Sequence, residues 1–127
     1  GTLWLGTYFG GVNYFNPEYE IYTRYKASDT ERDGLSSSII GRMIEDKDGN
    51  LWICTEGGGV NVYYRKEGTF RWLRHEEGRN SISHNNVKAI YYDEKGERMW
   101  FGTHLGGLNK LDLRTNRFTH YSRFICR

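Results

Sequence analysis

Short runs of apolar residues recur along this chain at a fixed interval, and three of them contain a tryptophan. These tryptophans, Trp4, Trp52 and Trp100, are each 48 residues apart. In the second copy the apolar residues are consecutive, Leu51-Trp52-Ile53, rather than alternating with polar ones. A strand that is covered on both faces has this pattern. Self-similarity at about 40–50 residues, built on short strands, predicts a propeller or a related array.

Each complete repeat predicts four short strands separated by glycine-containing turns, of which Gly57-Gly58-Gly59 is one. The expected strands are residues 40–46, 51–55, 59–64 and 69–73 in the second copy, 87–93, 99–103, 107–112 and 117–121 in the third, and 3–7, 11–15 and 21–25 in the first. Four antiparallel strands make one propeller blade. The sequence therefore predicts an all-β fold of about eleven strands, a β-propeller fragment of nearly three four-stranded blades.

We assign all 127 residues to part of one β-propeller domain. Residues 1–25 form an incomplete blade, and residues 35–73 and 82–121 form full blades. A closed propeller needs about four to eight blades. A shorter arc would leave two apolar blade faces and open strand edges bare. We therefore expect either an excerpt of a larger propeller or copies that self-associate to close a ring, and we favour the excerpt.

Residues that recur in every copy are expected to be structural. The tryptophans could stack on sugars, but their repetition at identical strand positions favours blade packing. The recurring asparagines are expected to form hydrogen bonds within the third strand or its turn, and the paired glycines permit tight turns. The structural repeat set is Trp4, Trp52, Trp100, Gly10, Gly11, Gly58, Gly59, Gly106, Gly107, Asn13, Asn61 and Asn109.

The copies disagree most in the loop between the second and third strands. In a propeller this loop shares one rim with the connections between blades, here residues 26–34 and 74–81. Loops placed on a rigid scaffold commonly carry binding. The candidate ligand-binding residues of this rim are Tyr8, Phe9, Glu56, His104, Arg74, Arg79 and Asn80. The alternative is drift of unconstrained surface loops.

The charge of the chain excludes some classes of partner. Its net charge is +2, and its lysines and arginines are scattered, so nucleic-acid binding has no compositional support. No apolar run is long enough to span a membrane, so we expect membrane attachment only through segments outside this chain. Cys54 takes the place of Gly6 and Gly102, which predicts a buried structural thiol. A disulfide with Cys126 has no support in the spacing.

No catalytic, metal or cofactor motif stands out. Asp46 and the turn after it resemble a calcium loop faintly, but the spacing and the closing glutamate are missing. They also differ from the Asp-box hairpin of sialidases, because Asp46 is three residues before Gly49 rather than two. The four histidines lack metal-binding spacing. We expect no metal, no cofactor and no enzymatic activity in this segment.

One set of residues resembles a known repeat. In the second copy the set is Leu35-Ser36, Ile40, Glu45-Asp46, Gly49, Leu51-Trp52-Ile53, Thr55 and Gly58-Gly59-Val60-Asn61. In the third it is Ser83, Val87, Asp93, Gly96, Trp100-Phe101-Gly102-Thr103, Gly106-Gly107-Leu108-Asn109 and Phe118-Thr119-His120-Tyr121. Both resemble the two-component regulator propeller repeat. Departures are Cys54 in place of glycine, and Tyr91-Tyr92 where an acidic residue would precede Asp93.

The resemblance implies a sensor. Such repeats build the periplasmic region of hybrid two-component histidine kinases of Bacteroides-type bacteria, which recognise a ligand, often an oligosaccharide, and signal to a kinase. It implies that the remaining blades of the same protein are partners of this segment. A protein-interaction scaffold is the main alternative, and a propeller lyase or sialidase-like enzyme is a weaker one, because propellers host all three.

Overall fold

The computed structural model describes residues 3–7, 10–16 and 21–121, which form eleven strands and one 3₁₀ helix. The first sheet contains β1 (Leu3–Thr7), β2 (Gly11–Asn16) and β3 (Ile21–Tyr25). The second contains β4 (Ile40–Glu45), β5 (Leu51–Thr55), β6 (Val60–Tyr64) and β7 (Thr69–Leu73). The third contains β8 (Val87–Asp93), β9 (Arg98–Thr103), β10 (Gly107–Asp112) and β11 (Arg117–Tyr121). The helix η1 (Glu31–Asp33) lies between β3 and β4.

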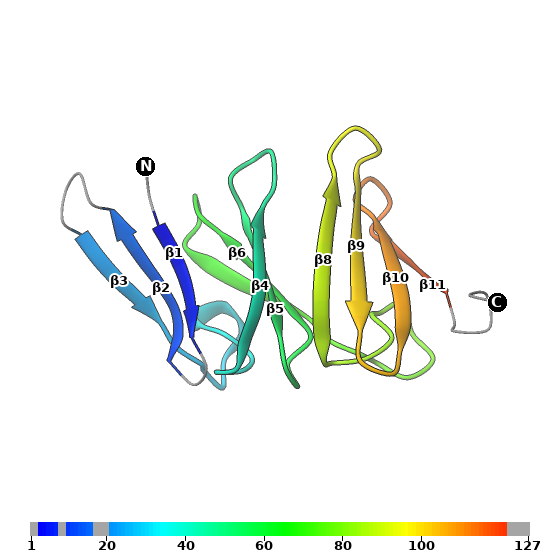
Figure 1. Cartoon of the computed structure of the whole chain (residues 1–127), viewed down its shortest axis with the longest axis horizontal. Helices are drawn as coiled ribbons and strands as arrows, with labels where there is room; N and C mark the ends of the chain where they lie inside the picture. The colour runs from blue at the N-terminus through cyan, green and yellow to red at the C-terminus, as the bar shows by residue number, and fades with distance from the viewer. Residues whose placement is uncertain (1–2, 8–9, 17–20, 122–127) are drawn as a thin grey trace.

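The strands form three antiparallel sheets, in each of which spatial order follows chain order. Figure 1 shows the three sheets side by side, with the second sheet between the other two. The predicted all-β fold of about eleven strands is confirmed, and predicted and observed strand ends differ by one residue at most. The agreement follows from local signals, because glycine turns and apolar runs mark every strand.

The second sheet buries both of its faces, which explains the consecutive apolar residues in its sequence. Every residue of β5 is buried. Leu51 and Ile53 pack with Val12 of the first sheet, whereas Trp52 packs with Phe101 of the third. Successive side chains of a strand point to opposite faces. The two apolar clusters are therefore the contacts between neighbouring blades, and β5 contributes to both.

Each sheet has an inner edge and an outer edge. The inner edge is formed by β4 in the second sheet and by β8 in the third, and these two strands contact each other. The outer edge is formed by β7 and β11. Both inner strands carry a β-bulge near their start, between Ile40 and Met43 and between Val87 and Ala89. A bulge redirects the side chains around it and is common beside functional sites.

The thiol of Cys54 is buried, as predicted, and forms no disulfide with a described residue. Cys126 lies outside the described residues. The surroundings explain the preference for a small residue at this position. A Cβ atom at Gly41 would lie 3.6 Å from the Cβ atom of Cys54, and one at Gly102 would lie 3.3 Å from that of Ala89. The contact at Gly102 is tight, so the inner strand would have to shift to admit a side chain there, whereas the contact between position 41 and Cys54 is an ordinary one.

Burial raises the pKa of the Cys54 thiol to about 12, although the positive charge of Arg42 opposes the shift. We expect a Cys126→Ser variant to resist alkylation by iodoacetamide at pH 8 and to react within minutes in urea. Because the pKa in the folded state exceeds its value of 9.0 in an ordinary thiol, this group should lower stability as pH rises from about 9 toward 12. A Cys54→Ala variant should lose that pH dependence. Rapid labelling of the native protein would contradict the burial.

Candidate functional site

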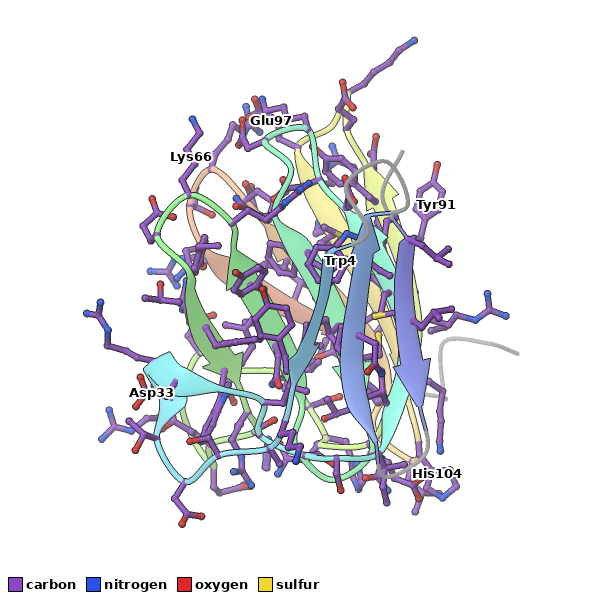
Figure 2. All side chains as sticks on the ribbon, turned by 90° about the vertical axis from the view of Figure 1, so that its left-hand side faces the viewer. Trp4, Asp33, Lys66, Tyr91, Glu97 and His104 are labelled. Carbon is purple, nitrogen blue, oxygen red and sulfur yellow. The ribbon has the colours of Figure 1, made fainter. Side chains whose placement is uncertain are left out.

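The loops between the second and third strands and the connections between sheets lie at one end of the molecule, here called the loop rim. It contains residues 56–59, 104–106, 26–39 and 74–86. In Figure 1 the loop rim is the lower end of the sheets. Figure 2 labels Asp33 and His104 there, with Lys66 and Glu97 at the opposite end. The predicted site residues that the structure describes therefore lie at one end of the fold.

A buried asparagine in the third strand of each complete blade anchors the loop rim. Oδ1 of Asn61 accepts a hydrogen bond from the backbone N–H of Ser36 at 2.9 Å, and its Nδ2 donates to Ser36 Oγ at 2.7 Å. Ser36 Oγ donates in turn to the carbonyl oxygen of Gly58 at 2.7 Å. Asn109 and Ser83 form the same pair of bonds in the third sheet. These bonds tie each connection to the loop beside it.

Glu56 lies in a cavity of about 310 Å³ between the inner strands, here called the inner hollow. The residues that line the inner hollow are Ile39, Ile40, Gly41, Arg42, Thr55, Glu56, Val87 and Lys88. Lys88 Nζ lies 3.9 Å from Glu56 Oε2, and about half of each side chain is exposed. The cavity thus combines an apolar wall with one acidic and two basic groups from two neighbouring sheets.

Arg42 and Lys88 were missed by the sequence prediction of the site. Both lie on inner strands, at the bulges that begin β4 and β8. In the aligned repeats Lys88 stands opposite Gly41, and Arg42 stands opposite Ala89. The copies therefore disagree at these two positions as well, but the sequence does not show that the two side chains share one cavity.

Arg74 and Asn80 lie in a different cavity, of about 260 Å³, between the outer strands β7 and β11. We call it the outer cleft. There the side-chain amide of Asn80 forms hydrogen bonds with the backbone of the third sheet. Its Nδ2 donates to the carbonyl oxygen of Asn116, and its Oδ1 accepts from the N–H of Phe118, both at 2.8 Å. These bonds fix the turn before β11 and cover a donor on an edge strand.

The outer strand of the second sheet is covered in the same way. Oε2 of Glu31 accepts a hydrogen bond from the backbone N–H of Trp72 at 2.7 Å, and Nε1 of Trp72 donates to the carbonyl oxygen of Gly34 at 2.8 Å. Unpaired groups on an edge strand invite pairing with another chain. The connections between blades therefore protect the outer edge with side chains.

His104 and Arg79, the two other described candidates, line neither the inner hollow nor the outer cleft. The ring of His104 packs edge-on against that of His84, with 6.4 Å between centroids. The next residue, Leu105, is 87% exposed and has a φ of 68°. Arg79 is exposed, and its backbone N–H donates to the carbonyl oxygen of Glu76. Tyr8 and Phe9 lie outside the described residues. The structure thus separates the described candidates instead of gathering them in one cavity.

His75 has acceptors at both ring nitrogens. Nδ1 lies 2.9 Å from the carbonyl oxygen of Ile82, and Nε2 lies 3.1 Å from Oε2 of Glu77. The carbonyl of Ile82 and then the carboxylate of Glu77 raise the pKa of the His75 imidazole above its ordinary value. The protonated ring donates at both nitrogens, whereas the neutral ring donates at only one. His75 therefore fastens the connection between β7 and β8.

The carboxylate of Asp46 accepts hydrogen bonds from the turn that follows it and from the next strand. Oδ1 accepts hydrogen bonds from the N–H groups of Asp48 and Asn50, and Oδ2 accepts one from Nε1 of Trp52, each at 2.9 Å. In the described part of the chain, no three His, Cys, Asp or Glu side chains gather as metal ligands would. The same residues contain no helix long and apolar enough to cross a membrane. The three hydrogen bonds of Asp46 therefore stabilise the turn between β4 and β5.

Known structures support the propeller architecture. One is described as the extracellular domain of the hybrid two component system BT3049 from B. thetaiotaomicron (TM-score 0.79, 19% identity, 96% of this chain). Another is that of BT4673 from the same organism (TM-score 0.69, 28% identity, 90% of this chain). PorZ, a surface component of the type-IX secretion system of Porphyromonas gingivalis, is more distant (TM-score 0.52, 14% identity, 95% of this chain). The chain spans 17%, 15% and 26% of these three proteins.

Sequence comparison identifies the repeats themselves. No curated protein matches this chain. Residues 34–57 and 81–104 match the two component regulator propeller family. Each matched segment runs from the connection before an inner strand to the loop after the second strand, so the two segments occupy the same place in consecutive sheets. These two segments are therefore similar to two component regulator propeller repeats and lie in phase in consecutive sheets.

Proposed function

We propose that this chain is part of the periplasmic sensor propeller of a hybrid two-component system and that it has no catalytic role. The observation that carries the proposal is the pair of family repeats at residues 34–57 and 81–104. The 28% identity to the extracellular domain of a hybrid two component system supports it. The remaining blades of the same protein, or a second copy, complete the ring.

The ligand is an oligosaccharide that binds at the loop rim, and the inner hollow is its contact with this segment. Two features support this assignment. The rim is held rigidly by the Asn61 and Asn109 hydrogen bonds, and it presents an open cavity where two sheets meet. A binding site on a rigid scaffold loses little conformational entropy when its ligand binds.

A signal requires that the ligand bind two states of the sensor differently. The inner hollow is lined from the second and third sheets together. A ligand that contacts both sheets therefore senses their relative placement. In the proposed mechanism, binding favours one placement of propeller domains or of a dimer, and segments outside this chain carry that change across the membrane.

The test uses the full-length gene product in its native membrane. Added protease should cleave this region in spheroplasts but not in intact cells, and one or more of a panel of plant, host and microbial oligosaccharides should raise kinase autophosphorylation. A cytoplasmic location, or a full-length protein without a kinase whose propeller degrades the panel, would overturn the proposal. Kinase activation by a protein partner, with no response to any saccharide, would favour the scaffold alternative.

A further inference from the structure

The inner hollow contains more basic than acidic side chains. Arg42 is exposed and forms no ion pair with any described residue. Lys88 and Glu56 are 3.9 Å apart and about half exposed, and an exposed pair of this kind contributes about 0–1 kcal/mol. A ligand anion can therefore displace Glu56 from Lys88 at little cost. The inner hollow therefore offers two basic side chains to a ligand anion, and its one carboxylate is held only weakly by Lys88.

The two cations are placed by equivalent features of neighbouring blades. The bulges at the starts of β4 and β8 lie at the same position in the repeat. In the second sheet Arg42 lies within the bulge between Ile40 and Met43, whereas in the third Lys88 lies within the bulge between Val87 and Ala89. Each inner strand thus contributes one basic side chain to the same cavity, although the two positions do not align. The residues that repeat to build the fold do not include these two basic positions, so the fold itself does not require them.

The lining indicates the chemistry of the ligand. Arginine binds planar carboxylate and also sulfate groups through two parallel hydrogen bonds. Among the described residues no aromatic ring lines the inner hollow, so these residues offer a neutral sugar no face on which to stack. Ile39, Ile40 and Val87 form an apolar wall, which strengthens charge interactions beside it. The volume of about 310 Å³ lies at the lower end for ligand sites and suits one sugar unit.

We propose that the inner hollow binds the acidic group, a carboxylate or a sulfate, of a charged saccharide, with Arg42 and Lys88 as its two cationic contacts. This inference rests on the proposed sensor function and adds the class of ligand. The acidic group lies between the inner strands of two blades, so its binding draws β4 and β8 together. Glu56 leaves Lys88 when the ligand enters.

Calorimetric titration of the full-length protein in detergent tests the inference with four probes. These are a tetrasaccharide of galacturonic acid, a sulfated disaccharide, a neutral galactose tetrasaccharide and inorganic sulfate. We expect at least one of the first two to bind tightest, with an affinity that falls as NaCl is raised. Arg42→Gln and Lys88→Gln should each weaken that binding at least tenfold. Tighter binding of the neutral sugar, or equal binding of free sulfate, would overturn the inference.

Two further variants sharpen the test. Lys66→Gln removes the same charge at the opposite end of the molecule (Figure 2), and it should leave affinity unchanged. Gly41→Lys adds a cation at the position equivalent to Lys88, where a Cβ atom would meet only ordinary contacts of 3.5–3.7 Å. It should tighten binding several-fold. Equal effects of Lys66→Gln and Arg42→Gln would contradict a local site.

The outcomes separate this inference from the function on which it rests. Kinase activation by neutral saccharides that is insensitive to Arg42→Gln and Lys88→Gln would refute the acidic ligand and leave the sensor proposal standing. Absence of activation by any saccharide, charged or neutral, would refute the saccharide sensor itself.

Discussion

Replacing Gly59 by alanine should lower the free energy of unfolding by more than about 3 kcal/mol. Gly59 has a φ of 74°, a conformation that costs an alanine about 1 kcal/mol. In addition, a Cβ atom at this position would overlap the backbone carbonyl oxygen of Leu73 and lie 3.1 Å from the Cα atom of Arg74. The backbone of β6 and β7 must separate to admit it. Urea denaturation of the wild type and the variant measures the loss.

A second glycine provides the matched control. Gly68 has a similar φ of 69°, but a Cβ atom there would meet nothing within 4 Å. We therefore expect Gly68→Ala to cost only about 1 kcal/mol. The difference between the two variants isolates the steric overlap from the backbone conformation. Equal losses would show that the contact with Leu73 is relieved by small shifts, and the close approach would then have no structural importance.

The same overlap recurs at Gly11, where an added Cβ atom would meet the carbonyl oxygen of Tyr25. This recurrence explains the second glycine of the pair in the first and second copies, and Gly107 of the third copy shares the positive φ, at 78°. The sequence comparison predicted a tight turn at these glycines. It could not show that the constraint comes from the neighbouring strand, because that contact depends on how β6 and β7 are paired.

The strands were predictable because their signals are local. Consecutive apolar residues in Leu51-Trp52-Ile53 indicated burial on both faces, and each face proved to contact a different sheet. The cation pair of the inner hollow was not predictable in the same way. Arg42 and Lys88 are brought together by bulges, and a bulge is a property of the pairing between strands rather than of one strand's sequence.

Asn80 illustrates a second limit. It lies on the rim in a segment that does not repeat, and such a residue is a reasonable candidate for binding a ligand. Its amide instead bonds to Asn116 and Phe118, which are 36 and 38 residues away in the sequence. The partner of a polar side chain in a connection between blades depends on the next blade. A single repeat therefore cannot distinguish a ligand contact from an edge cap.

Replacing Asn61 by alanine should lower the free energy of unfolding by about 3 kcal/mol. Asn61 is fully buried, and its amide bonds to both the backbone N–H and the hydroxyl of Ser36. Alanine removes both bonds and leaves the Ser36 N–H without its acceptor. An unsatisfied buried donor costs more than the bond itself contributed. The loss should be measured by urea denaturation, with retention of the β-sheet circular dichroism signal below the transition.

A double-mutant cycle with Ser36→Ala tests whether the two residues act as one unit. Ser36→Ala alone leaves Nδ2 of Asn61 without its acceptor and should also be destabilising. Because each single change breaks the same Nδ2–Oγ bond, the double variant should lose about 1–2 kcal/mol less than the sum of the single losses. Additive losses would mean that the two side chains are independent. If they are coupled, the asparagine of each repeat is what holds the connection before an inner strand against the loop beside it. The inner hollow lies beside such segments, so the start of each inner strand that carries a cation is positioned before any ligand arrives.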